Sequence, residues 1–143
     1  MKITSALRSL ASVVMVATVI PVAGGFGAVR HGSTISPQLV GNWTRIVSKA
    51  DVQHSGATGI PAGSVWTLRI SKDGSASAFG TKGVGSFGGT VTSTGADRVQ
   101  INLGIPSANA YSWHVSKRLL TFTKVTDTVQ DRIAVFVGTW ERK

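Results

Sequence analysis

The chain has 143 residues, no cysteine, and 15 Lys and Arg against six Asp and Glu, for a formal net charge of +9. This length is too short for two ordinary domains, and the lack of cysteine excludes a disulfide-stapled mini-protein and a lipidated cysteine anchor. The basic residues are scattered along the chain rather than gathered on one stripe between aromatics, so no nucleic acid is expected as a partner.

The first 25 residues have the three parts of a secretory signal peptide. Lys2 and Arg8 supply the positive start, an apolar run extends from Leu10 to Ala23, and small residues surround a cleavage point near Gly25. The run is shorter than the roughly 20 residues that cross a bilayer as a helix; an uncleaved membrane anchor is the alternative. We therefore expect a secreted protein with a signal peptide at 1–25, a flexible segment at 26–36 and one barrel domain at 37–143.

Beyond the signal, apolar residues recur with a period of two, which is typical of half-buried strands. Trp66, Leu68 and Ile70, for example, share one face of their run, and polar residues occupy the other face. Eight successive runs are predicted as strands: 40–47, 65–71, 75–80, 85–93, 98–104, 110–115, 119–124 and 132–140.

The connections between these strands are mostly short. Asp73-Gly74 is a strong two-residue hairpin signal, and 93–98 carries a second reversal. Parallel crossovers need a dozen or more residues, so the short turns favour antiparallel neighbours. The exception is the Gly-rich connection 48–64, which is long enough to fold over a barrel mouth and carries a predicted helical turn at 49–54.

The pattern Gly-x-Trp-x-Arg occurs twice, at 41–45 and at 138–142. Eight antiparallel strands leave two open edges, and closing the sheet into a barrel removes both. The first strand then pairs with the last, so that Trp43 and Trp140 can lie near each other across the closure, where a large ring can plug the narrow end of the barrel. Arg142 can stack on an indole there. Gly41, Trp43, Trp140 and Arg142 are the residues expected to close the barrel.

These residues also carry a family resemblance. Gly41-Asn42-Trp43 on the first strand, with an Arg at the end of the last, resembles the signature of lipocalins and the wider calycin group. The stretch from Tyr111 to Lys143 is similar to the end of small secreted lipocalin-like proteins of actinobacteria. The resemblance spans 37–143 and implies an all-β, eight-stranded antiparallel up-and-down barrel that binds a small hydrophobic ligand. The chain departs from lipocalins in lacking a clear helix after the last strand.

A ligand site is expected inside the barrel. Small residues at 76, 78, 80, 85 and 89 favour a hollow interior, whereas an eight-stranded barrel can also be filled by its own side chains. Arg45 shares a face with Trp43 and, if buried, needs Glu141, Asp131 or a ligand carboxylate as its partner, unless a bulge turns it to solvent. The predicted lining is Arg45, Trp66, Leu68, Ile70, Val99, Ile101, Leu103, Tyr111 and Trp113.

No catalytic residue, metal or cofactor is predicted. His31, His54 and His114 are far apart and lack ligand-like spacing. The Gly-x-Gly-x-x-Gly spelling at 83–88 lacks the strand-to-helix context of a dinucleotide loop. Tyr111 and His114 with Asp127 or Asp131 could perform acid–base chemistry, as in some calycin-like isomerases and cyclases, but the first two face opposite ways on a regular strand.

The composition and the resemblance together favour one function over two alternatives. We expect a secreted monomer that binds a small hydrophobic or amphipathic ligand. The first alternative is a non-catalytic module with a solid interior, whose basic exterior meets a protein or the anionic cell envelope. The second, less favoured, is an isomerase or cyclase.

Overall fold

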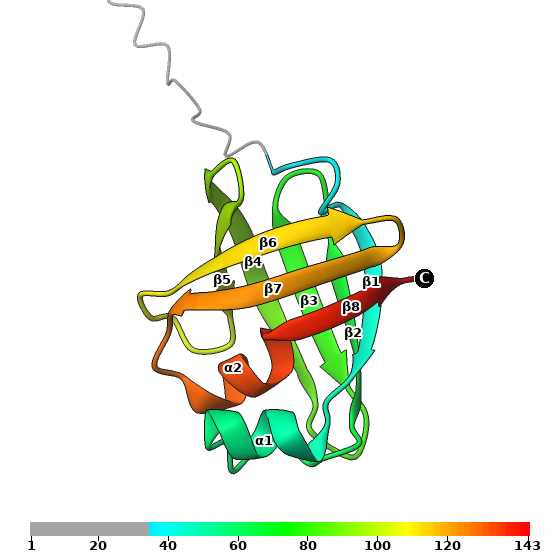
Figure 1. The fold of residues 1–143 in the computed structure, drawn as a ribbon, viewed down its shortest axis with the longest axis vertical. Coiled ribbons are helices and arrows are strands. Elements are labelled where there is room, and N and C mark those ends of the chain that lie inside the picture. The colour runs from blue at the N-terminus through cyan, green and yellow to red at the C-terminus, as the bar shows by residue number, and fades with distance from the viewer. Residues whose placement is uncertain (1–34) are drawn as a thin grey trace, which may run out of the picture. The chain divides into compact units, whose positions relative to one another are not determined.

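The computed structural model describes residues 35–143, and in them eight antiparallel strands form a closed barrel (Figure 1). Each strand pairs with the next, and β8 pairs back to β1, which confirms the predicted up-and-down order. This architecture is compatible with a lipocalin-like fold. The strands are β1 (Gly41–Ile46), β2 (Val65–Ile70), β3 (Ser75–Gly80), β4 (Ser86–Gly95), β5 (Arg98–Leu103), β6 (Ala110–Ser116), β7 (Leu119–Thr126) and β8 (Gly138–Arg142).

The predicted signal peptide and nearly all of the predicted flexible segment, residues 26–34, lie outside the described residues. Ile35 and Leu39, which precede β1, are buried in the core. The described residues, 35–143, lie in one compact unit, and the ladder of paired strands closes within it.

Alternation by two decides which side chains enter the barrel. In β2, Trp66, Leu68 and Ile70 are buried, and Arg69 between them is exposed. The β2–β3 hairpin turns at Asp73-Gly74, where Gly74 has a φ of 82°. The Asp73 carboxylate accepts hydrogen bonds from the backbone N–H and hydroxyl of Ser75, at 2.9 and 2.7 Å, and these bonds lower its pKa. The turn chemistry thus fixes the register that the alternation requires.

Two short helices lie against each other at one end of the barrel (Figure 1). Helix α1 (Lys49–Ser55) follows β1 where a helical turn was predicted, and Ser48 and Asp51 form a capping box at its start. Helix α2 (Gln130–Phe136) precedes β8. We call this end the mouth; the connections β1–β2, β3–β4, β5–β6 and β7–β8 meet there, because successive strands alternate in direction.

The prediction of a strand over 132–140 is wrong in its first half, because 132–136 belong to α2 and β8 begins only at Gly138. Alternation of Ile133, Val135 and Val137 resembles a strand. The buried residues, however, include Arg132, Val135 and Phe136, which are spaced three and four apart and lie on one face of a helix. Because Arg132 is charged, a pattern based on hydrophobicity alone does not count it as buried and therefore does not show the helical period.

Candidate functional site

The predicted interior residues form part of one continuous packed core. Arg45, Trp66, Leu68, Ile70, Val99, Ile101, Leu103 and Tyr111 are all buried, and Trp113 is partly buried against the others. Gly80, the small residue at the end of β3, does not leave open space beside it. A Cβ added at Gly80 would come within 2.8 Å of the Trp66 ring, so the indole fills the volume that the glycine leaves. The middle of the barrel is occupied by its own side chains.

Arg45 enters the barrel at the mouth and is 7% exposed. Its Nη2 donates to the Asp51 carboxylate at 2.8 Å, and its Nη1 donates to the carbonyls of Val135, at 3.1 Å, and Val137. The prediction that Glu141 or Asp131 pairs with Arg45 is therefore wrong, because Asp51 is its acidic partner. The alternative of a bulge that turns Arg45 to solvent is also wrong, because Arg45 is buried. The error arose because Asp51 lies six residues along the chain, on a helix that folds back over the mouth.

The position of Arg45 gives it a structural role. Burial lowers the pKa of its guanidinium, and the adjacent Asp51 carboxylate opposes that effect. For Asp51, burial raises the pKa, but hydrogen bonds from Ser48 and the charge of Arg45 outweigh it and hold the pKa below its usual value. One guanidinium thus joins the start of α1 to the end of α2, and both helices are fixed over the mouth.

A second buried cluster lies beside the first, made of Tyr111, Asp127 and Arg132. The Arg132 guanidinium forms a bidentate pair with the Asp127 carboxylate, with both N–O distances at 2.6 Å, and the Tyr111 hydroxyl donates to the same carboxylate. Arg132 also donates to the Ile105 carbonyl at 2.7 Å and to the Ser107 hydroxyl at 2.5 Å. These bonds connect α2, β6 and the β5–β6 loop.

Electrostatics in this cluster keep the carboxylate ionised. Burial raises the pKa of Asp127, but the hydrogen bonds from Arg132, Tyr111 and the Val129 N–H outweigh burial and hold the pKa below its ordinary value. Burial, together with the neighbouring carboxylate, raises the pKa of the Tyr111 phenol. Hydrogen bonding to Asp127 raises the pKa of Arg132. The cluster is therefore a neutralised ion pair with a protonated phenol attached.

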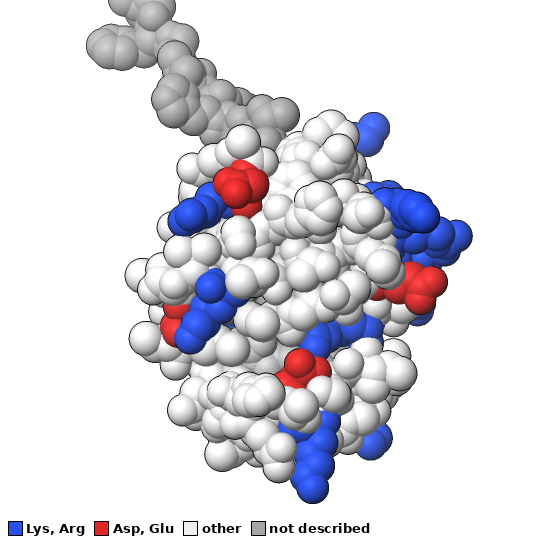
Figure 2. All heavy atoms as spheres, in the orientation of Figure 1, with Lys and Arg blue, Asp and Glu red and all other residues white. Residues whose placement is uncertain are grey.

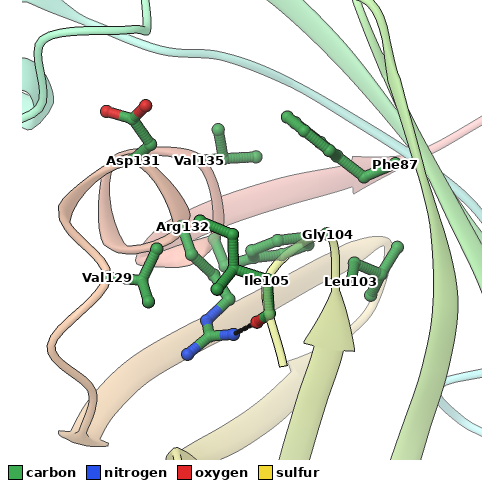
Figure 3. A pocket seen from close by; sticks show the side chains of 9 residues that line it. Phe87, Leu103, Gly104, Ile105, Val129, Asp131, Arg132 and Val135 are labelled. Atoms are coloured by element: carbon green, nitrogen blue, oxygen red, sulfur yellow. Dashed lines mark hydrogen bonds between the residues drawn. The ribbon is translucent and has the colours of Figure 1, made fainter. Parts of the chain in front are cut away.

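An apolar pocket of about 80 Å³ opens between α2 and the end of β5 (Figure 3). Its wall consists mainly of apolar side chains from three elements and one loop, with Asp131 and Arg132 among them. Figure 3 shows Phe87 and Leu103 on the strand side and Val129, Asp131 and Val135 on the α2 side. The lining residues are Phe87, Leu103, Gly104, Ile105, Val129, Asp131, Arg132, Val135 and Phe136.

Of the predicted ligand-binding residues, only Leu103 lines this pocket. Phe87, Ile105 and Phe136 were missed. Phe87 stacks on Trp66 with ring centres 5.7 Å apart, so the pocket continues the aromatic core outward. No local pattern marks Ile105, which is 64% exposed in a loop, or Phe136, which lies in the helix that was predicted as a strand.

The residues considered for acid–base chemistry do not come together in one site. His114 is exposed on β6 and is not part of the Tyr111 cluster, and Asp131 accepts hydrogen bonds from the N–H groups of Thr58 and Gly59 at 3.2 Å. A phenol whose pKa is raised and whose proton is held by a buried carboxylate is a poor proton donor to a substrate. Within 35–143, no three His, Asp or Glu side chains gather to hold a metal ion.

Neither α1 nor α2, the helices of the described part, is long and apolar enough to cross a membrane. No family model, curated protein or solved structure matches the chain.

Proposed function

We propose that this protein is a secreted, lipocalin-like barrel that binds a small apolar ligand at the pocket between α2 and β5. The observation that carries the proposal is the composition of the pocket wall, which is apolar and open at the mouth while the interior behind it is filled. Ligand sites in proteins are mostly apolar and have a few polar groups that fix orientation. The six apolar side chains that define the wall are Phe87, Leu103, Ile105, Val129, Val135 and Phe136.

The charges around the pocket favour a neutral ligand. Arg132 already donates four hydrogen bonds, two of them to Asp127, so its positive charge is balanced within the protein. Asp131 at the pocket carries a carboxylate without a basic partner among its hydrogen bonds. A ligand carboxylate would meet repulsion there and would find no free guanidinium. A neutral ligand with an alcohol or amide tip fits this environment better than a fatty acid.

The small size of the pocket limits how much of a ligand it can enclose. The cavity of about 80 Å³ is smaller than the roughly 150 Å³ cavity that accepts benzene. One wall is α2, and it is attached to the barrel through Arg45, Arg132 and its own packing rather than through a strand ladder. A ligand with more than a few heavy atoms therefore either projects from the open side of the pocket or displaces α2 against the contacts of Arg45 and Arg132.

A titration with N-phenyl-1-naphthylamine, which is neutral, apolar and fluorescent, tests the proposal. We expect saturable one-to-one binding that Ile105→Asp weakens roughly tenfold or more, because the new carboxylate faces an apolar ligand. Ile46→Asp is the matched control, since the two isoleucines are 64% and 65% exposed and Ile46 lies away from the pocket. Dodecanol is expected to displace the probe at lower concentration than dodecanoate.

Two results would contradict the ligand-binding proposal. Probe fluorescence that rises without saturation would indicate adsorption to the surface. Equal weakening by the two aspartate variants would show that the pocket is not the site. Either result favours the alternative of a filled barrel that acts through its exterior.

A further inference from the structure

Three exposed apolar side chains form a continuous patch on the outside of β1, β2 and β3. Ile46 is 65% exposed, Val65 38% and Phe79 50%. The register places Ile46 directly opposite Val65, and Phe79 opposite Thr67, which is two residues from Val65. Side chains that are directly or diagonally opposite on one face of a sheet lie within contact range. These three residues, which we call the outer patch, are therefore neighbours.

Positive charge surrounds the outer patch. Lys49 follows β1 by three residues and Lys82 follows β3 by two, so both lie at the mouth end of the patch. Lys82 reaches back toward β2, and its Nζ donates to the Ala62 carbonyl at 2.9 Å. On the opposite side, Arg69 projects from the exposed face of β2, and the Nζ of Lys143 lies 3.4 Å from the Thr67 hydroxyl.

One acidic residue lies on the same outer surface. Glu141 of β8 is opposite Thr44 of β1. It is the single acid within the four strands β8, β1, β2 and β3, and the adjoining helix and turn add Asp51, which pairs with Arg45, and Asp73, which accepts from Ser75. Figure 2 shows a neighbouring face, on which a group of basic side chains, with an acidic side chain beside it, lies at the edge where β8 ends. Residues 31–143 carry 12 Lys and Arg against six Asp and Glu, for a net charge of +6.

This combination favours a lipid surface over a protein partner. Protein–protein interfaces are depleted in lysine, whereas anionic membranes attract lysine and arginine placed around apolar side chains that enter the interface. Addition of a partner strand is excluded at β1, β2 and β3, because both edges of each are already paired in the closed barrel. An isolated apolar residue needs no explanation, but three adjacent ones within a basic ring point to a binding surface.

We propose that the outer patch docks the barrel on an anionic lipid surface, with Ile46, Val65 and Phe79 entering the headgroup region and the four surrounding cations contacting lipid phosphates. The site is separate from the pocket and does not depend on the proposed ligand. Because the patch borders the mouth, docking there would hold the mouth close to the bilayer.

The experiment is vesicle co-sedimentation of residues 31–143, the unit that contains the complete barrel. Vesicles contain either equal parts phosphatidylglycerol and phosphatidylcholine, or phosphatidylcholine alone. We expect binding to the anionic vesicles, weakened by salt, and little binding to the neutral ones. Ile46→Thr with Phe79→Thr should weaken binding roughly tenfold or more, and Lys49→Gln or Lys82→Gln about fivefold each.

Controls come from β7, on the other side of the barrel. Val125 is 44% exposed and Lys124 is exposed beside it, so Val125→Thr and Lys124→Gln remove the same chemistry without touching the outer patch. Both variants should bind within twofold of the unmodified barrel, whereas the outer-patch variants should bind more weakly. Attraction by net charge alone would weaken Lys124→Gln as much as Lys49→Gln. Circular dichroism and urea unfolding confirm that each variant is folded.

Three outcomes would overturn the proposal. The first is absence of binding to anionic vesicles. The second is an equal loss in the β7 controls, which would assign binding to net charge alone. The third is sedimentation as a dimer that Ile46→Thr with Phe79→Thr abolishes while vesicle binding is unchanged, because the patch would then be covered by a second copy of the chain.

Discussion

Replacing Arg132 by Met tests whether the buried ion pair stabilises the mouth. The substitution keeps most of the side-chain length but removes four hydrogen bonds, and it leaves the Asp127 carboxylate, with a side-chain exposure of 0%, without its cation. Removing one partner of a buried pair costs about 3–5 kcal/mol. Since small domains unfold at about 5–15 kcal/mol, a urea titration followed by tryptophan fluorescence should show a large fall in the unfolding midpoint.

The pH dependence of this loss identifies its cause. In the unmodified protein the pKa of Asp127 lies below its ordinary 3.8, so its contribution to the free energy of unfolding is complete above 3.8 and is lost as pH falls through the folded pKa. Without Arg132, the largest of the influences that oppose burial is removed, so the folded pKa of Asp127 rises above its value in the unmodified protein. The destabilisation of Arg132→Met should then shrink as pH falls from the folded pKa of Asp127 in the variant to its lower folded pKa in the unmodified protein, because the carboxylate is protonated first in the variant and the unfolded state is the same for both.

A double variant separates the uncompensated charge from the lost contacts. Asp127→Asn with Arg132→Met removes both charges, so its unfolding free energy should exceed that of Arg132→Met alone by about 1–3 kcal/mol. If the two variants are equally unstable, and the loss in Arg132→Met is the same at neutral and acidic pH, the reasoning is refuted and the cost lies in packing alone.

Three further substitutions test the closure and the helices, each by urea unfolding. Arg142→Met removes a guanidinium 4.3 Å from the Trp43 ring centre and its two backbone contacts; we expect a loss of about 1–3 kcal/mol and altered Trp emission. Gly138→Ala places a Cβ 2.8 Å from Arg45 Nη1 at a φ of 124° and should cost about 1–3 kcal/mol, whereas no loss would contradict that backbone geometry. Ser48→Ala removes the α1 cap and should cost about 1 kcal/mol, and a change below a few tenths would show that the cap is not needed.

The barrel could be predicted because its signals are local. Alternating residues such as Trp66, Leu68 and Ile70 define a strand without reference to the rest of the chain, and Asp73-Gly74 defines a turn. The closure then follows from the need to pair both sheet edges. The parts of the fold that could not be predicted, including the start of the last strand at Gly138, depend on contacts between distant segments.

The mouth is the part that the sequence could not predict, and the reason is physical. Asp51 and Arg45 are six residues apart, and Asp127 and Arg132 are five apart, but nothing in either spacing shows that a helix folds the charges into the core. The sequence around a charged residue that becomes buried does not differ from the sequence around one that stays exposed. The pocket could not be predicted for the same reason, because α2 forms one of its walls and is positioned by those two ion pairs.

The two copies of the Gly-x-Trp-x-Arg pentad form equivalent contacts where β1 pairs with β8 and closes the barrel. The indole N–H of Trp43 donates to the carbonyl four residues earlier, at 2.9 Å, and that of Trp140 does the same at 3.2 Å. The guanidinium of Arg142 lies 4.3 Å from the Trp43 ring centre, and that of Arg45 lies 5.8 Å from the Trp140 ring centre.

The reciprocity extends to the glycines. Each arginine lies over the glycine of the other pentad and donates to the carbonyls one and three residues before it: Arg142 to Val40 and Gln38, Arg45 to Val137 and Val135. The two pentads therefore form the same contacts about a local twofold relation, one at each end of the β1–β8 pair. Asp51 breaks the equivalence, because it pairs only with Arg45. The carboxylate on α1 thus makes the Arg45 end the covered mouth, while the same arrangement at Arg142 remains part-exposed beside the C-terminus.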